Sequence, residues 1–272
     1  MPAANEATEN APAEAQAPSG YFAARKRLLT PPLNNRRLTF REVRGAGWDL
    51  ADNPNDLSIY GMKPIVWYPL GMRILGRSAV ELTRDLHAKF VATEIARTLA
   101  EKGFRISDVI DPFAGSGNLL FHMLRATRAS HGVGLDLGEV LDLTRHNFTR
   151  LRWTGRLGFT RVSLHKQDWS HCVDYLKGRP ALVMVSPPWG PALDAAGLDL
   201  RMTAPPVMEV LERLSQSAQG SPTFAMVQTY PQMIEASVRE ITQRYQTLPS
   251  VRSANPAIHR SIDYLLLRLD RT

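Results

Sequence analysis

The chain has 272 residues, of which 44% are apolar, so it is long enough for one substantial α/β domain with a small addition. Its single cysteine, Cys172, excludes internal disulfides and cysteine-rich zinc sites and suits a reducing compartment. No apolar run is long enough to cross a membrane, and the net charge of +7 favours an anionic partner such as nucleic acid. We therefore expect a cytoplasmic protein without a membrane segment.

Residues 1–20 consist mainly of Ala, Pro, Glu, Asn and Thr, with no large apolar side chain after Met1. Such a segment cannot bury enough surface to offset its ordering entropy. It also lacks the basic start and apolar centre of a secretory signal. We predict a disordered tail.

Residues 21–82 form a basic and aromatic N-terminal extension. Between residues 21 and 46 seven basic side chains face a single acid, Glu42. One interpretation is an arm that contacts phosphates; the other is a partly extended arm that packs on the domain through Leu28, Leu29 and Phe40. The candidates for phosphate contacts are Arg25, Lys26, Arg27, Arg36 and Arg37.

Residues 47–81 contain many turn residues and four large aromatic side chains, Trp48, Tyr60, Trp67 and Tyr68. The pattern predicts only short strands or loops here. These aromatic side chains either contact a substrate or serve ordinary packing.

Residues 83–272 form the predicted main domain. An amphipathic helix over 81–104 carries Leu86, Phe90, Val91, Ile95 and Leu99 on one face. Strands and helices then alternate, which indicates parallel strands joined by crossover helices, a doubly wound α/β fold. The predicted order is strand 105–111, helix 118–128, strand 131–136, helix 138–153, strand 161–167, helix 171–178, strand 181–186, helix 207–218, strand 223–229 and helix 232–246. Two last apolar stretches, 248–252 and 262–269, indicate an antiparallel pair around a turn at residues 253–256.

A glycine-containing turn follows the first of these strands. Residues 109–118 read Val-Ile-Asp-Pro-Phe-Ala-Gly-Ser-Gly-Asn. Gly115 and Gly117 let the backbone turn sharply and let a ligand come close, and the helix beyond offers unpaired N–H groups. A dinucleotide fingerprint would need a small residue at Leu120, and a P-loop would need a lysine at Asn118. The alternative is a tight turn without a ligand.

An acidic residue, Asp136, ends the next strand nineteen positions after Gly117, which is the place for a carboxylate that holds ribose hydroxyls. The sequence Asp-Pro-Phe-x-Gly-x-Gly resembles motif I of class I S-adenosylmethionine-dependent methyltransferases, above all the amino-methylating branch. This resemblance implies a Rossmann-like sheet of seven strands with a C-terminal antiparallel hairpin, and S-adenosyl-L-methionine as the cofactor. Asp168 would then accept from the adenine amine, unless it only caps the helix expected near His171. The residues implied to bind the cofactor are Asp111, Phe113, Ala114, Gly115, Gly117, Asn118, Asp136, Leu137, Asp168 and Trp169.

A second motif, Ser186-Pro187-Pro188-Trp189-Gly190, follows the strand at 181–186. Prolines cannot donate to a strand ladder, so the loop is stiff and holds its side chains at the carboxyl end of the strand, where ligands bind in open α/β sheets. Acceptor oxygens of Ser186 and Pro187 can orient an exocyclic amine, and Trp189 can stack on its ring. The alternative is a proline-rich turn with a core tryptophan.

The Ser-Pro-Pro-Trp-Gly motif is similar to that of the trimethylguanosine synthase family, which methylates the exocyclic N2 of a guanine cap. The resemblance covers residues 83–269 and implies RNA methylation on an amine of guanine or adenine, with Ser186, Pro187, Pro188 and Trp189 as the catalytic residues. A small-molecule N-methyltransferase of specialised metabolism is the first alternative. A catalytically silent subunit with the methyltransferase fold is the second. The histidines show no metal-ligand spacing, so no metal is expected.

Overall fold

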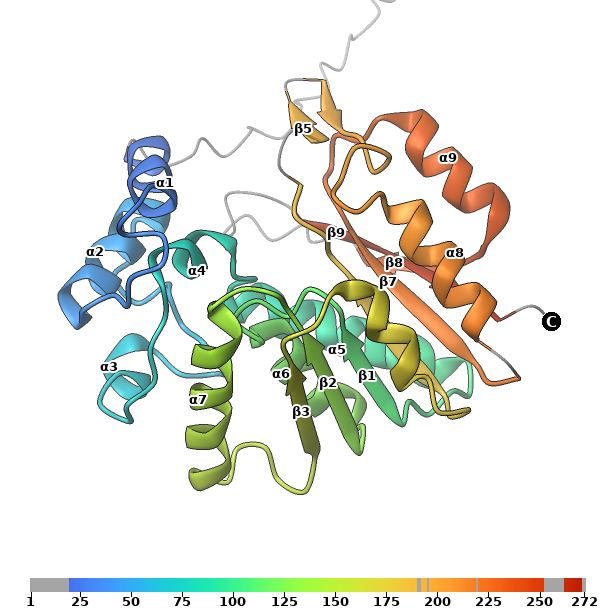
Figure 1. The fold of residues 1–272 in the computed structure, drawn as a ribbon, viewed down its shortest axis with the longest axis horizontal. Coiled ribbons are helices and arrows are strands. Elements are labelled where there is room, and N and C mark those ends of the chain that lie inside the picture. Colours follow the sequence, from blue (N-terminus) through green and yellow to red (C-terminus); the bar gives the residue numbers. More distant parts are fainter. Residues whose placement is uncertain (1–19, 190–191, 195, 219, 252–261, 271–272) are drawn as a thin grey trace, which may run out of the picture.

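A sheet of seven strands forms the centre of the protein in the computed structural model, which describes residues 20–189, 192–194, 196–218, 220–251 and 262–270 (Figure 1). The strands lie side by side in the order β3 (Arg161–His165), β2 (His131–Leu135), β1 (Asp108–Asp111), β4 (Ala181–Val185), β7 (Thr223–Thr229), β9 (Asp263–Arg268) and β8 (Gln246–Val251). All pairings are parallel except those of β9, which is antiparallel to both β7 and β8. The predicted seven-stranded α/β fold with a C-terminal antiparallel pair is confirmed.

Helices cover both faces of this sheet (Figure 1). On one face lie α5 (Asp85–Glu101) and α6 (Asn118–Thr127), and on the other lie the 3-10 helix η1 (Trp169–Tyr175) and the helices α8 (Val207–Ser217) and α9 (Glu235–Arg244). A further helix, α7 (Val140–Trp153), connects β2 to β3. A short hairpin of β5 (Leu193–Asp194) and β6 (Gly197–Leu198), which no sequence pattern predicted, follows β4.

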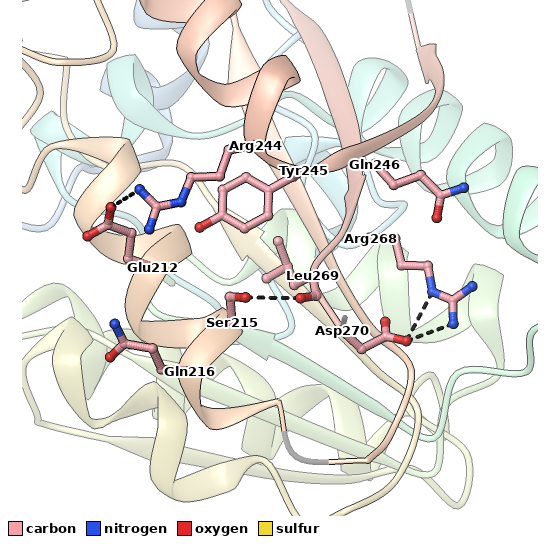
Figure 2. Close-up of a pocket in the computed structure, with 9 residues that line it drawn as sticks. All are labelled: Glu212, Ser215, Gln216, Arg244, Tyr245, Gln246, Arg268, Leu269 and Asp270. Atoms are coloured by element: carbon pink, nitrogen blue, oxygen red, sulfur yellow. Dashed lines mark hydrogen bonds and ion pairs between the residues drawn. The ribbon is translucent and has the colours of Figure 1, made fainter. Parts of the chain in front are cut away.

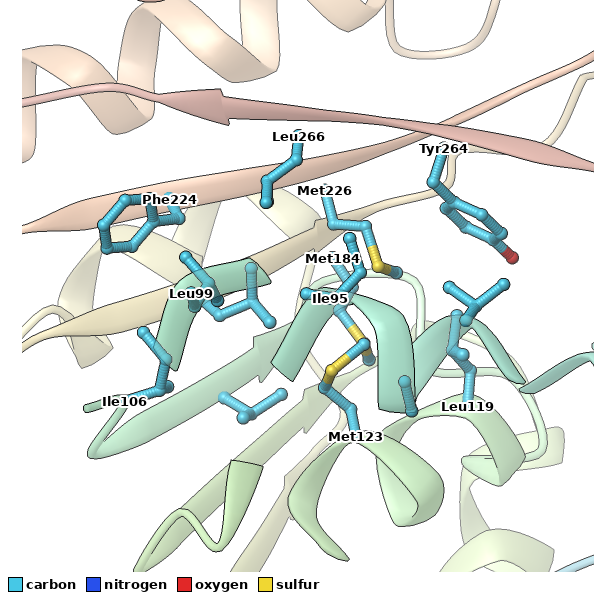
Figure 3. Close-up of a cluster of buried hydrophobic side chains, with 14 of the residues drawn as sticks. Ile95, Leu99, Ile106, Leu119, Met123, Met184, Phe224, Met226, Tyr264 and Leu266 are labelled. Atoms are coloured by element: carbon cyan, nitrogen blue, oxygen red, sulfur yellow. The ribbon is translucent and has the colours of Figure 1, made fainter. Parts of the chain in front are cut away.

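The core on the α5–α6 side is dense with aliphatic and methionine side chains (Figure 3). Ile95 and Met123 from the helices meet Met184 and Phe224 from the strands, and all four are at most 1% exposed. Burial of each such side chain stabilises the fold by roughly 1.5–3 kcal/mol. Because side chains alternate along β4, Leu182 and Met184 face this layer while Val183 and Val185 face the opposite one. A strand that is buried on both faces is continuously apolar, as β4 is.

The N-terminal extension contains four helices, so the expectation of short strands and of a partly extended arm is wrong, whereas residues 52–63 and 68–75 form turns and loops as expected. It contains α1 (Tyr21–Leu29), α2 (Phe40–Ala51), α3 (Pro64–Trp67) and α4 (Gly76–Glu81). A capping box starts α2, because the Thr39 hydroxyl accepts from the Glu42 N–H while the Glu42 carboxylate accepts from the Thr39 N–H at 2.8 Å. This Thr-x-x-Glu spacing was readable in the sequence. The extension packs against α6 and α7 through Phe121 and Phe148.

Two helices of the main domain differ from the prediction. The expected helix 171–178 is the 3-10 helix η1, which begins at Trp169 because Asp168 caps it. On α5, Leu86 and Phe90 are 58% and 40% exposed, although the periodicity assigned both to the buried face. The buried face of α5 includes Ala88, Val91 and Ile95, and Leu86 and Phe90 lie outside it.

Two expectations concern residues outside the described ranges: the disordered tail, described only from Gly20, and the turn at 253–256. The boundaries at residues 20 and 82 stay predictions. No helix in the described part of the chain has both the length and the apolar character that crossing a bilayer demands.

Candidate functional site

The loop after β1 owes its shape to two glycines in the left-handed region. Gly115 has φ +47° and Gly117 has φ +68°. A Cβ on Gly117 would lie 2.7 Å from Phe148 Cε2 and 2.9 Å from Thr144 Cγ2, so this position has no room for a side chain. A Cβ on Gly115 would meet only the Phe113 carbonyl oxygen at 3.9 Å. Gly117 is therefore needed for packing, whereas Gly115 presents open backbone to a ligand.

Asp136, at the end of β2, ties this loop to the next one. Its Oδ2 accepts from the Gly115 N–H at 3.0 Å, and its Oδ1 accepts from the Gly138 N–H at 2.8 Å. The side chain is half-buried. A carboxylate has about four lone-pair positions, so two backbone bonds leave acceptor capacity for hydroxyl groups. The structure thus puts Asp136 directly beside the glycine loop, as the sequence spacing indicated.

Asp111, the last residue of β1, is a buried carboxyl group that is 3% exposed. Burial raises its pKa to about 7, and the nearby Asp136 charge adds to the rise, while a hydrogen bond from the Phe113 N–H to Asp111 Oδ1 at 3.1 Å opposes it. A carboxyl group whose pKa is near neutral pH favours a cation beside it, because a positive charge would stabilise its ionised form.

Tyr60, in the extension, holds the glycine loop from outside, and sequence reasoning missed this role. Its hydroxyl donates to the Ser116 carbonyl, and its N–H donates to Asn118 Oδ1 at 2.7 Å. Asn118 Nδ2 donates to the Thr83 carbonyl at 2.8 Å. The Asn118 side chain is thereby engaged within the protein, which ties the start of α6 to the extension. Tyr60 is fully buried with φ +54°.

The other three aromatic side chains of residues 47–81 take different positions. Trp67 is fully buried and donates its indole N–H to the Leu57 carbonyl at 3.0 Å, which is a packing role. Trp48 is 58% exposed. Tyr68 is half-buried under Arg73, whose guanidinium lies 4.0 Å from the ring centroid.

The remaining predicted cofactor residues lie around the same edge of the sheet. The Ala114 N–H donates to the Leu135 carbonyl at 2.9 Å, and Leu137 is 62% exposed. Phe113 and Trp169 are partly buried against one core cluster. Asp168 Oδ1 accepts from the Ser170 N–H at 2.9 Å. Burial by itself would raise the pKa of Asp168, but hydrogen bonds from Ser170 and Trp169 outweigh it and lower that pKa. The capping interpretation of Asp168 is thus observed, and its contact with an adenine amine stays a prediction.

The Ser-Pro-Pro-Trp segment leaves the sheet next to the glycine loop, because β4 pairs in parallel with β1 and aligns Val183 with Ile110. Pro187 is buried, while Ser186 and Trp189 are half-buried. The Trp189 ring meets the Tyr230 ring edge-on, with centroids 6.0 Å apart and planes at 72°. Tyr230, which directly follows β7, was not predicted, although an aromatic residue after the strand beside β4 could have indicated it.

The basic arm is partly neutralised by its own carboxylates. Arg27 pairs with Asp49 at 2.9 Å, and Arg36 pairs with Glu42. Arg25, Lys26 and Arg37 are exposed. Phosphate contacts by the arm stay a prediction, and the pairing weakens the case for two of its five candidates.

A cavity of about 400 Å³ lies at the opposite edge of the sheet from these motifs (Figure 2). One of its lining residues, Arg268, pairs with Phe224 near the start of β7. The motifs, by contrast, follow the ends of the parallel strands. Its charged groups are largely paired within the wall: Arg244 with Glu212, and Arg268 with Asp270 at 2.7 Å. This cavity shares no residue with the predicted site.

Comparisons with known proteins find similarity only among solved structures. No family model and no curated protein sequence matches the chain. It is similar to the Escherichia coli protein yhhF, described as a candidate methyltransferase (17% identity, 67% of this chain and 86% of that chain, TM-score 0.43). It is also similar to 1,6-didemethyltoxoflavin-N1-methyltransferase of Burkholderia thailandensis with bound 1,6-didemethyltoxoflavin and S-adenosylhomocysteine (16%, 68% and 79%, TM-score 0.44), and to the methyltransferase domain of bacterial CtHen1 (12%, 67% and 98%, TM-score 0.45). Because these TM-scores lie below 0.5, a function must come from the site itself.

The two loop glycines should respond differently to alanine. Gly117→Ala places its Cβ against Phe148 in a left-handed backbone, so we expect a loss of roughly 2–5 kcal/mol in the free energy of unfolding. Gly115→Ala meets open space and should lose only roughly 1–2 kcal/mol, the backbone term alone. Urea unfolding of both variants checks this, and equal losses would contradict the assigned packing role of Gly117.

Asp111→Asn tests the buried carboxyl group. The folded protein keeps the Asp111 proton up to a pH of about 7, whereas the unfolded chain releases it near its ordinary pKa of 3.8. This raised pKa makes the wild type lose stability as pH rises through that window. Asn stays neutral, so the stability of the variant relative to wild type should rise from pH 4 to pH 7, by on the order of 2–4 kcal/mol. A pH-independent difference in urea unfolding would mean that Asp111 ionises normally.

Proposed function

We propose that the protein is an S-adenosylmethionine-dependent N-methyltransferase that acts on an exocyclic amine of a planar acceptor, guanine or adenine in RNA or in a nucleotide. One observation carries this proposal: the parallel pairing of β1 with β4 brings the glycine loop and the Ser-Pro-Pro-Trp segment, some seventy positions apart in the chain, to one edge of the sheet. A methyl donor site and an amine acceptor site must be neighbours for direct transfer.

The residues of the first motif fit the proposed cofactor. Gly115 leaves its backbone open, and Asp136 keeps lone pairs that can accept from ribose hydroxyls. Asp111 supplies a buried carboxyl group suited to a cationic neighbour. When bound, S-adenosylmethionine supplies an electrophilic methyl group on a sulfonium. Because Asp136 also orders the loop, we expect cofactor binding and loop order to depend on the same side chain.

The residues of the second motif suit a flat amine. An exocyclic amine on a purine is a weak nucleophile, since its lone pair is delocalised into the ring. Oxygen atoms of Ser186 and Pro187 accept from its N–H groups and turn the lone pair toward the methyl group, which contributes through positioning. Trp189 stacks on the ring while Tyr230 buttresses it edge-on. The proton leaves to solvent after transfer, so no strong base is needed.

Cofactor affinity tests the first half of the proposal. Asp136→Ala removes charge-assisted hydrogen bonds to the ribose, and we expect titration calorimetry with S-adenosylmethionine to show affinity about 10- to 100-fold weaker. Asp142→Ala is the matched control, since Asp142 is an exposed carboxylate on the adjacent helix whose side chain is 60% accessible. Radiolabelled cofactor offered with total RNA and, separately, with a small-molecule extract identifies the acceptor class. Unchanged affinity in Asp136→Ala removes this residue from the cofactor site, and label in small molecules alone overturns the nucleobase acceptor.

Trp189 tests the acceptor half. Its ring is half-buried, so Trp189→Ala should cost about 1–2 kcal/mol of stability, less than the ~3–5 kcal/mol of a fully buried ring. We expect most methyl transfer to be lost while cofactor affinity is retained, and Trp189→Phe to restore part of the transfer by stacking. If both variants bind cofactor and transfer methyl groups at the wild-type rate, Trp189 is a packing residue only.

A further inference from the structure

One surface of the protein is strongly basic and lies outside the candidate site. It is formed by α7 from Arg145 onward, the loop after it and the edge strand β3, and we call it the α7–β3 surface (residues 145–166). Six lysine and arginine residues and no carboxylate occur between Asp142 and Asp168. The positive charge of this segment is therefore nearly as large as the net charge of the whole chain, which is +7.

Most of these cations lack an acidic partner. Arg145 and Lys166 approach Asp142 at 2.8 and 4.0 Å. The other four, Arg150, Arg152, Arg156 and Arg161, form no ion pair with any carboxylate in the described ranges. In the arm that the sequence suggested as a phosphate binder, Arg27 and Arg36 are paired with carboxylates, whereas Arg25, Lys26 and Arg37 are exposed. Uncompensated arginines are the groups that attract a polyanion.

Two of these arginines, Arg150 and Arg152, are also held in place without being neutralised. The Arg150 guanidinium lies over the Trp153 ring, 4.4 Å from its centroid, and packs beside Gly71 of the extension. Arg152 donates to the Val162 carbonyl at 3.2 Å. Their charges are therefore presented from ordered side chains, which lowers the entropic cost of a contact.

Two aromatic side chains stand exposed among these charges. Trp153 is 71% exposed and Phe159 is fully exposed, although both are large apolar groups. Exposed aromatic rings with neighbouring arginines form the stacking platforms of proteins that bind single-stranded nucleic acids. Phe148 and Leu151, on the other side of α7, are buried in the core, so α7 itself is firmly anchored.

We infer that the α7–β3 surface binds single-stranded nucleic acid, with the arginines on the phosphates and Trp153 and Phe159 on the bases. Its role in delivering an acceptor strand rests on the proposed function. The geometry suits that role, because Thr144 near the start of α7 donates to the Gly115 carbonyl at 2.7 Å. Trp153 follows nine residues later, about 14 Å along the helix. A strand on this surface would thus lie within a few nucleotides of the candidate site.

An anionic membrane could also attract exposed arginines and aromatic rings. The arrangement favours nucleic acid, because Arg156 lies between Trp153 and Phe159 in the chain and the surface has no continuous apolar stripe. A helix that lies in a membrane interface needs such a stripe, and the apolar stripe of α7 is turned into the core.

Fluorescence anisotropy of the full chain with a labelled single-stranded RNA of about 20 nucleotides tests the inference across a salt series. Replacing Arg150, Arg152 and Arg156 by Gln should weaken binding at least about tenfold at low salt and make the salt dependence shallower by about two in log–log slope. Trp153→Ala should weaken binding about 5- to 100-fold with the slope unchanged. The control replaces Arg97, Arg239 and Arg244 by Gln, exposed arginines of α5 and α9 with the same total charge; its affinity should stay within about twofold of wild type.

Equal weakening in the control would reduce the effect to net charge and overturn the inference, as would unchanged binding in the triple variant. Binding to phosphatidylserine vesicles without binding to RNA would make the surface a membrane contact instead. Calorimetry with S-adenosylmethionine is run on the same variants and keeps the two proposals apart. Normal cofactor affinity without RNA binding removes only the surface, whereas RNA binding without cofactor affinity removes only the proposed enzyme.

Discussion

The central position of β1 is the constraint on which the rest of the site depends. β1 pairs with β2 on one side and with β4 on the other, all in parallel, so the three strands end at one edge of the sheet. Asp111, Asp136 and the Ser-Pro-Pro-Trp segment follow these ends. Adjacent apolar residues of β1 and of β4 pack into the cores on opposite faces of the sheet, Val109 and Leu182 on one face and Ile110 and Val183 on the other. The hydrophobic effect that builds these cores therefore also assembles the polar edge.

The N-terminal extension acts as a part of that edge rather than as an appendage. The Tyr60 hydroxyl donates to the Ser116 carbonyl, and a buried pair of Asp85 Oδ1 and His122 Nε2 at 2.6 Å joins α5 to α6. Asp85 Oδ2 also accepts from the Gly61 N–H at 2.8 Å. These bonds link the extension to α5 and α6, so the shape of the glycine loop depends on residues some sixty positions earlier in the chain. Tyr60 thus supports the loop and Trp67 the core, whereas Trp48 is exposed.

Charge is distributed unevenly, and pairing decides which charges can reach a partner. The basic arm contains many cations, but capping of α2 recruits Glu42 beside Arg36, and Asp49 meets Arg27. The four arginines of the α7–β3 surface that pair with no carboxylate of the described residues form a second concentration of positive charge, near exposed aromatic rings. A cation that already has a carboxylate neighbour offers less to an external phosphate, since much of its field is cancelled locally. Counting charges along the sequence cannot separate these cases.

The sequence by itself determined the order of the strands and helices, the glycine loop and the position of Asp136, because these follow from apolar periodicity and from backbone conformations that few residues can adopt. It also predicted where the Ser-Pro-Pro-Trp segment leaves the sheet. The helices of the extension were missed, since their apolar residues are few and become buried only against Phe121 and Phe148 of other elements. The exposure of Leu86 and Phe90, the engagement of Asn118 with Tyr60 and the edge-on contact of Trp189 with Tyr230 were likewise decided by tertiary structure. Each depends on contacts between residues far apart in the chain, and local pattern carries no information about such contacts.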